Sequence, residues 1–302
     1  MAARWLTLPR RAILVYGTHW QSTRHDADWE WMEMKQSGFV KLLGTSFYYE
    51  FAGAGEPVVF LHAGICDGRM WDPQLDWFAN KFRVVRYDMR GYGKTAVSPT
   101  TYSHHHDLHA LLDFLQIKKA HLVGCSLGGS TALDFTLTYP ERVNSLTLVC
   151  SSPNGYEFVG TLPAQYDDLV AAHKTKDIGK IAALETEIWV VGQQRTPEQV
   201  PAHIRNLVTE MNLIAVENEM SGIGDEEALD PTAITRLAEV QADTLVLMGD
   251  LDEPDILQAS RLMADTIPHA QSTTLPGTAH LPNLEKPQLF NEVLLSFLTN
   301  QQ

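Results

Sequence analysis

Residues 120–128 read Ala-His-Leu-Val-Gly-Cys-Ser-Leu-Gly, and this stretch decides the fold. It starts as an apolar, strand-like run and ends in the pattern Gly-x-Ser-x-Gly. When a strand turns sharply into a helix with a serine held at the corner, neighbouring side chains would clash across the turn. Gly124 and Gly128 remove that clash. The pattern predicts a strand, a tight turn and a helix, with Ser126 as a candidate nucleophile.

A serine nucleophile needs a base that takes its proton and an acid that orients the base. After a strand-turn-helix serine, the expected chain order is Ser, then Asp or Glu, then His. A buried-strand pattern at residues 244–248 runs into the acidic loop 249–255, and after one more predicted helix and strand the loop 276–282 carries His280. His269 precedes the final strand, so we expect it at the opposite edge of the sheet.

Strand-like and helical patterns alternate along most of the chain. This alternation predicts an α/β fold with a mostly parallel central sheet flanked by helices, and ligand-binding loops at the carboxyl ends of the strands. A hairpin is expected over residues 39–52, and strands are expected near 58–62, 82–87, 120–125 and 144–150.

The alternation stops between about residues 155 and 240, where the pattern becomes helical. We interpret this segment as a helical cap inserted between two halves of the sheet. Helices are predicted there over 162–173, 178–191 and 197–220. The predicted domains are an N-terminal extension (1–37), a core (38–154 and 241–302) and the cap (155–240).

The order of the motifs resembles that of the α/β-hydrolase family, from about Gly38 to the C-terminus. Besides the serine motif, the matching segments are the oxyanion loop 62–64 (HAG), the D-x-R-G-x-G turn 88–93, the G-x-x-D loop 249–252 and the G-x-x-H loop 277–280. The family acid is the fourth residue of its loop, which selects Asp252. Asp250 and Asp255 remain alternatives. Asp88 and Arg90 are predicted to pin their turn by internal hydrogen bonds, outside the site.

The resemblance implies a serine mechanism that needs no cofactor and no metal. Ser126 would attack an acyl carbonyl after His280 takes its proton, while Asp252 orients the imidazole. The backbone N–H groups of Leu127 and Gly64 would stabilise the oxyanion. The oxyanion loop of the family most commonly resembles His-Gly, with glycine directly after the histidine, whereas this chain has Ala63 at that position. If that position needs a positive φ, alanine is disfavoured.

Residues 70–91 look most similar to carboxylesterases and enol-lactonases, which favours a small ester or lactone as substrate. Dehalogenases and epoxide hydrolases resemble the same scaffold with Asp in place of Ser126, so they are disfavoured. Carbon-carbon bond hydrolases, peptidases and acyltransferases keep the serine and stay open as alternatives. A ligand-binding, hydrolase-like receptor is a further alternative, because fold does not fix function.

Apolar residues of the predicted cap are candidates for the substrate pocket. The alternative is that each packs as ordinary cap core, because apolar residues at helical spacing mostly contact neighbouring helices. The candidates are Tyr156, Phe158, Trp189, Met211 and Met220.

Charge and composition exclude other classes of protein. The net charge of −14, from 23 basic and 37 acidic residues, would repel nucleic acid and anionic lipid. The sequence contains no run of about 18 apolar residues, so no membrane span is expected. The three cysteines form neither a metal pattern nor an even framework, which favours a reduced, cytoplasmic compartment. We expect a monomer or a weak homodimer.

Two smaller patterns have competing interpretations. Three cysteines fall near the predicted catalytic edge: Cys66, Cys125 and Cys150. One interpretation is that bulky reagents attached to their thiols would inhibit by obstruction. The other is that the cysteines serve as small buried hydrophobes. His105 and His109 have metal-like spacing, but a helix capped by Ser103 with an exposed histidine face is the preferred interpretation.

The first 33 residues match nothing in the family pattern. Their apolar run 12–16 is too short for a secretory signal, and Met32 or Met34 could be the true start.

Overall fold

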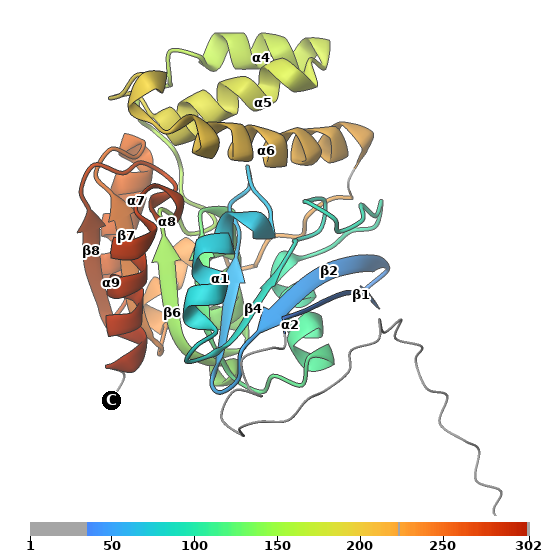
Figure 1. Ribbon diagram of the computed structural model, residues 1–302, viewed down its shortest axis with the longest axis vertical. Coiled ribbons are helices and arrows are strands. Elements are labelled where there is room, and N and C mark those ends of the chain that lie inside the picture. Colours follow the sequence, from blue (N-terminus) through green and yellow to red (C-terminus); the bar gives the residue numbers. More distant parts are fainter. Residues whose placement is uncertain (1–34, 223, 301–302) are drawn as a thin grey trace, which may run out of the picture. The chain divides into compact units, whose positions relative to one another are not determined.

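The computed structural model describes residues 35–222 and 224–300 (Figure 1). Within these ranges the strands form one eight-stranded sheet, in the order β1-β2-β4-β3-β5-β6-β7-β8. The hairpin of β1 and β2 is antiparallel and pairs antiparallel with β4, whereas all later pairings are parallel. The predicted mostly parallel sheet is confirmed. The strands are β1 (Gln36–Leu42), β2 (Thr45–Ala52), β3 (Pro57–Leu61), β4 (Arg83–Tyr87), β5 (Ala120–Cys125), β6 (Val143–Val149), β7 (Asp243–Gly249) and β8 (Ala270–Leu275).

The central strands are apolar on both faces because helices cover both. Along β3, Val58 and Phe60 pack on one face with residues of α1 and α9, while Val59 and Leu61 pack on the other with residues of α2 and α3. This division follows from the alternation of side chains along a strand. The helices are α1 (Asp72–Phe78), α2 (His104–Phe114), α3 (Leu127–Thr138), α7 (Pro254–Thr266), α8 (Pro282–Glu285) and α9 (Pro287–Thr299).

Between β6 and β7 the chain forms α4 (Tyr166–Thr175), α5 (Ile178–Thr186) and α6 (Ala202–Gly222), which we call the helical insertion. Figure 1 shows these helices stacked beyond the end of the sheet toward which the β6 arrow points. A π-helical turn, Glu187–Val191, extends α5 and completes the segment predicted over 178–191.

Two starting points in the insertion differ from the predictions. Helix α4 begins four residues later than predicted, at Tyr166, and α6 begins at Ala202, immediately after Pro201. Val200 is extended, as expected for a residue that precedes proline, so the short 3₁₀ turn Pro197–Gln199 does not continue into the helix.

The predicted extension 1–37 lies almost wholly outside the described residues, and β1 begins at Gln36. The predicted limits of core and cap stay predictions. None of the helices described is both long and apolar enough to cross a membrane.

Candidate active site

Ser126 lies at a strained corner between β5 and α3. Its φ is 51° and its ψ is −117°, a conformation that side-chain-bearing residues rarely adopt. The flanking glycines make this turn possible. A Cβ on Gly124 would lie 2.2 Å from the carbonyl oxygen of Gly128, and one on Gly128 would lie 2.3 Å from that of Leu61. The turn therefore has the geometry that the Gly-x-Ser-x-Gly pattern predicts.

Backbone hydrogen bonds hold the corner on both sides. The Ser126 N–H donates to the carbonyl oxygen of Val149 at 2.9 Å, and the Ser126 carbonyl accepts from the Ser151 hydroxyl at 2.8 Å. The same carbonyl accepts from the Ser130 N–H at 3.0 Å. Ser126 as a whole residue is half-buried.

His280 and Asp252 form a buried pair at the carboxyl edge of the sheet. His280 Nδ1 lies 3.0 Å from each carboxylate oxygen of Asp252, and both side chains are about 2% exposed or less. Because a carboxylate only accepts hydrogen bonds, Nδ1 carries the proton and Nε2 is left as the basic nitrogen. The Glu253 N–H donates to Asp252 at 2.8 Å and helps to fix the carboxylate.

The two alternative acids have other partners. Asp250 accepts a hydrogen bond from the Gly277 N–H, and Asp255 accepts from the Gly160 N–H. Each therefore pins a loop, and the structure brings only Asp252 of these three aspartates to His280.

Gly64 and Leu127, the two candidate oxyanion donors, are neighbours. A Cβ on Gly64 would lie 3.6 Å from the Cβ of Leu127. Among the described residues, neither backbone N–H has a protein acceptor. Ala63 is absent from the described non-glycine residues with positive φ, so alanine brings no strain here. Its own N–H donates to Met70 Sδ at 3.2 Å.

His62 positions this loop, a role that the sequence motif did not reveal. Its Nε2 accepts from the Met89 N–H and its Nδ1 lies 2.9 Å from the carbonyl oxygen of Ala63. Accepting at Nε2 places the proton on Nδ1, which donates to that carbonyl. Burial lowers the pKa of His62 to about 4, so the ring is neutral near pH 7.

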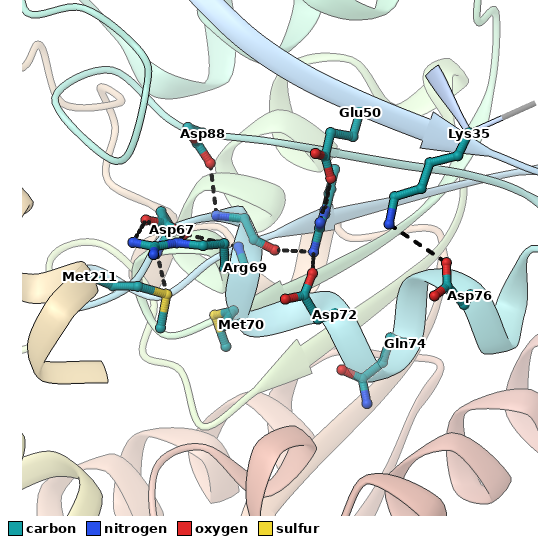
Figure 2. A network of polar contacts seen from close by, with 12 residues as sticks. Lys35, Glu50, Asp67, Arg69, Met70, Asp72, Gln74, Asp76, Asp88 and Met211 are labelled. Atoms are coloured by element: carbon teal, nitrogen blue, oxygen red, sulfur yellow. Dashed lines mark hydrogen bonds and ion pairs between the residues drawn. The ribbon is translucent and has the colours of Figure 1, made fainter. Parts of the chain in front are cut away.

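A polar network secures the chain that follows the loop (Figure 2). Asp88 accepts from the backbone N–H groups of Gly68 and Lys94, each at 2.8 Å, which agrees with its predicted pinning role. Asp67 pairs with Arg69, and the Asp67 N–H donates to Met211 Sδ of α6 at 3.5 Å. The network thus links the oxyanion loop to the helical insertion.

The five predicted pocket residues lie in different surroundings. The centre of the Trp189 ring lies 4.6 Å from the centre of the His280 ring, so the structure brings this residue to the candidate site. Met211 is fully buried beside Asp67. Tyr156 and Phe158 contact each other edge to face, and Phe158 is 56% exposed. Met220 packs with the buried residues of the insertion itself, away from the motifs above.

A cavity of about 260 Å³ adjoins the oxyanion loop. Its walls come from that loop, from the turn after β4, from the segment that precedes α2, and from α5 and α6. The sequence analysis assigned none of these wall residues except Gly64. Those used below are Gly64, Tyr92, Tyr102, Glu185, Asn212 and Glu219.

Within residues 35–222 and 224–300, one group of buried side chains has ligand atoms close enough to hold a metal ion. The candidate atoms of Cys150, Asp252 and His280 lie within 4.8 Å of one another. Burial raises the pKa of the Cys150 thiol well above its ordinary value, which disfavours the thiolate that a metal needs. His280 Nδ1 is also engaged with Asp252. The donor set therefore does not fit a resident metal.

Two smaller patterns concern buried side chains. All three cysteines are free and buried, which agrees with their interpretation as small buried hydrophobes, and inhibition by bulky thiol reagents stays a prediction. Ser103 occupies the N-cap position of α2, but its hydroxyl bonds the His105 ring and makes no side-chain cap. His104 and His105 are buried, whereas His106 is exposed and the His109 side chain is 30% exposed. The predicted exposed face is therefore wrong at His105 and holds only in part at His109.

The comparisons with known proteins agree with this geometry. The model of the α/β hydrolase fold family matches residues 56–287. This chain belongs to the α/β-hydrolase fold family. Its relatives include proteins named as hydrolases, and this chain is an enzyme.

Similar α/β hydrolases act on different bonds. A 2-hydroxy-6-oxononadienedioate/2-hydroxy-6-oxononatrienedioate hydrolase of Paraburkholderia phymatum is 28% identical, over 88% of this chain and 96% of the relative. The solved structure of Est816, an N-acyl homoserine lactone degrading enzyme, is 28% identical with a TM-score of 0.68, covering 86% of this chain and all of that one. The enol-lactonase of Burkholderia xenovorans LB400, at 22% identity and a TM-score of 0.71, covers 87% of this chain and all of that one and shares the fold.

Proposed function

We propose that this α/β hydrolase cleaves small carboxylic esters or lactones through an acyl-enzyme on Ser126. The observation that carries the proposal is the buried His280–Asp252 pair, with its 3.0 Å contacts, together with a serine at a strained strand-to-helix corner. The Est816 structure supports a lactone or ester substrate by its stated activity.

The mechanism follows from the position of each proton. His280 Nε2 takes the hydroxyl proton as Ser126 Oγ attacks the carbonyl carbon, and Asp252 stabilises the resulting imidazolium. The carbonyl electrons move onto oxygen, where the N–H groups of Gly64 and Leu127 donate. Collapse of this intermediate expels the alcohol, which takes the proton from His280. Water then attacks the acyl-enzyme by the same route and releases the acid.

Carbon-carbon bond hydrolysis is the second candidate. The Paraburkholderia relative, whose identity to this chain is similar to that of Est816, is named as a hydrolase of a 2-hydroxy-6-oxo-dioate. Both reactions would use the same serine, base and oxyanion donors. They differ in the group that leaves, so the substrate cavity decides between them. For either reaction we propose a cytoplasmic monomer or weak homodimer that binds no nucleic acid.

The test is hydrolysis of a panel of p-nitrophenyl esters and small lactones by the wild type and by Ser126→Ala. We expect repeated turnover that is lost in the variant, and the preferred acyl length would measure the pocket. An absence of turnover by the correctly folded wild type would contradict the proposal and favour carbon-carbon cleavage. Unchanged turnover by Ser126→Ala would contradict the serine mechanism.

A further inference from the structure

The cavity beside Gly64 has an anionic wall. Glu185 of α5 and Glu219 of α6 line it, together with the phenol rings of Tyr92 and Tyr102. Gly64 belongs to the same wall, so the cavity adjoins one of the two candidate oxyanion donors. The lining contains no lysine, arginine or histidine among the described residues.

Glu185 is held in place as an acceptor. Asn212 Nδ2 donates to Glu185 Oε2 at 2.7 Å, which leaves acceptor positions on the carboxylate for another donor. Its side chain is 20% exposed, and His173 Nε2 lies 3.9 Å from Oε1, an ion pair when the imidazole is protonated. Burial raises the pKa of Glu185, while the Asn212 hydrogen bond and the His173 side chain act in the opposite direction.

The nearest arginine of the neighbouring turn does not neutralise the wall. Arg90 makes two hydrogen bonds to Asp107, at 2.8 and 2.9 Å, and its guanidinium lies 5.1 Å from the centre of the Tyr102 ring. Arg90 is therefore committed to a buried pair outside the cavity lining. Burial raises the pKa of Tyr92, and Tyr102 and the carboxylates of Glu226, Glu219 and Glu185 add to the shift in that order.

We infer that this cavity is a subsite for a cationic group, an ammonium carried by the ester or lactone substrate. Two carboxylates would attract the charge and the faces of aromatic rings would bind an alkylated ammonium. A substrate with a carboxylate in the same place would be repelled. The inference rests on the proposed function, and it favours ester or lactone cleavage over cleavage of the dioate substrates that the Paraburkholderia relative is named for.

The first test compares matched substrates that differ in charge. For the alcohol side the pair is acetylcholine and its neutral isostere 3,3-dimethylbutyl acetate. For the acyl side the pair is p-nitrophenyl 4-(trimethylammonio)butanoate and p-nitrophenyl 5,5-dimethylhexanoate, with the anionic p-nitrophenyl hemiglutarate as a third probe. We expect kcat/KM for the cation to exceed that of its isostere by about tenfold in one pair, with the anion poorest.

Variants connect the preference to the two carboxylates. In the double variant Glu185→Gln with Glu219→Gln, the ratio between cation and isostere should fall to about one. Glu217→Gln is the matched control, since Glu217 is an exposed acid of α6 that does not line the cavity, and it should keep the wild-type ratio. Neutral isosteres preferred in both pairs, while Ser126-dependent hydrolysis persists, would overturn the inference and leave the proposed function intact.

A binding measurement distinguishes failure of the subsite inference from failure of the proposed function. If the wild type hydrolyses no ester, the proposed function fails, and calorimetric titration with tetramethylammonium chloride still tests the subsite. We expect binding that weakens by about tenfold in the double variant and is unchanged in Glu217→Gln. No measurable binding to the wild type, or equal binding to all three proteins, would overturn the inference. Circular dichroism of each variant confirms folding.

Discussion

At the scale of single residues, hydrogen bonding separates the candidate acid from its neighbours. Asp250, Asp252 and Asp255 lie within one loop and the start of the next helix, yet Asp252 contacts the imidazole while the others accept from backbone N–H groups. Chain order predicted the loop, and the family pattern selected the residue. Periodicity and composition could not select the acid, because the three aspartates lie within six positions and differ only in the direction that the folded loop gives each side chain.

Asp252→Asn should reduce kcat by about 10⁴, since an amide in place of the carboxylate favours the wrong imidazole tautomer and cannot stabilise the imidazolium. Steady-state hydrolysis of the preferred ester measures the loss. Asp250→Asn and Asp255→Asn are matched controls, because both side chains pin loops instead of contacting His280. They should keep kcat within about threefold of the wild type. A large loss in either control together with a small loss in Asp252→Asn would contradict the assignment.

The cavity wall shows what residue-level sequence reasoning could not reach. Tyr92 and Glu185 line one cavity but lie far apart in the chain, so no local pattern joins them. Tyr92 is the second of the two variable positions of the D-x-R-G-x-G turn, which marks it as a loop residue but not as a wall residue. By contrast, Ser126 and His280 lie in short motifs whose spacing is set by strand-to-loop geometry, and such motifs can be found before the fold is known.

At the scale of elements, the corner between β5 and α3 tolerates no side chain beside the serine. Gly124→Ala would put a Cβ 2.2 Å from a backbone oxygen, so the turn must shift. We expect a loss of about 3 kcal/mol or more in the free energy of unfolding, measured by urea denaturation, with loss of hydrolysis. Gly179→Ala, on the exposed side of α5, should be neutral or stabilise by up to about 1 kcal/mol. Similar stabilities for the two variants would show that the turn is not constrained.

Helix α2 carries a stability term that depends on pH. His104 is 4% exposed, and burial, followed by the neighbouring side chains of His62, Arg90 and His105, lowers its pKa to about 3. The unfolded chain takes up a proton on this histidine near pH 6.5, whereas the folded protein does not until about pH 3. Because the unfolded state then binds more protons, this term lowers the free energy of unfolding as the pH falls from about 6.5 toward 3.

His104→Phe removes that term and keeps an aromatic ring in the site. The loss of stability between pH 7 and pH 5 should therefore be about 2 kcal/mol smaller in the variant than in the wild type. Urea denaturation at both pH values measures it. His106→Phe is the control, since His106 is exposed on the same helix turn, and it should keep the wild-type difference. An identical pH dependence in His104→Phe would contradict the burial argument.

Element boundaries were predictable where packing agrees with local pattern. The strand β5 matches its predicted range, because a uniform apolar run defines it. The helices α4 and α6 begin later than predicted, where proline and loop residues override helical periodicity. The exposed histidine face on α2 failed for a different reason. A polar residue at helical spacing gives no sign of whether the rest of the fold will cover it.

At the scale of the whole molecule, the order of motifs predicted the architecture because parallel strands bring distant loops to one edge of a sheet. The loops after β3, β5, β7 and β8 carry Gly64, Ser126, Asp252 and His280. The family model matches residues 56–287, and the first strand described begins at Gln36, so all of these loops lie within the part of the chain that the structure describes.

Deletion of residues 1–31 should leave ester hydrolysis and stability unchanged, because every strand, helix and site contact described above is made by residues 35–222 and 224–300. The experiment compares soluble yield, thermal midpoint and kcat/KM of the full chain and the shortened chain. Deletion of residues 1–44 is the matched control: it removes β1, whose pairing with β2 covers the edge of the sheet. The control should lose soluble protein, since an uncovered β2 edge invites association between chains. A comparable loss after removal of residues 1–31 alone would show that the extension contributes to the folded enzyme.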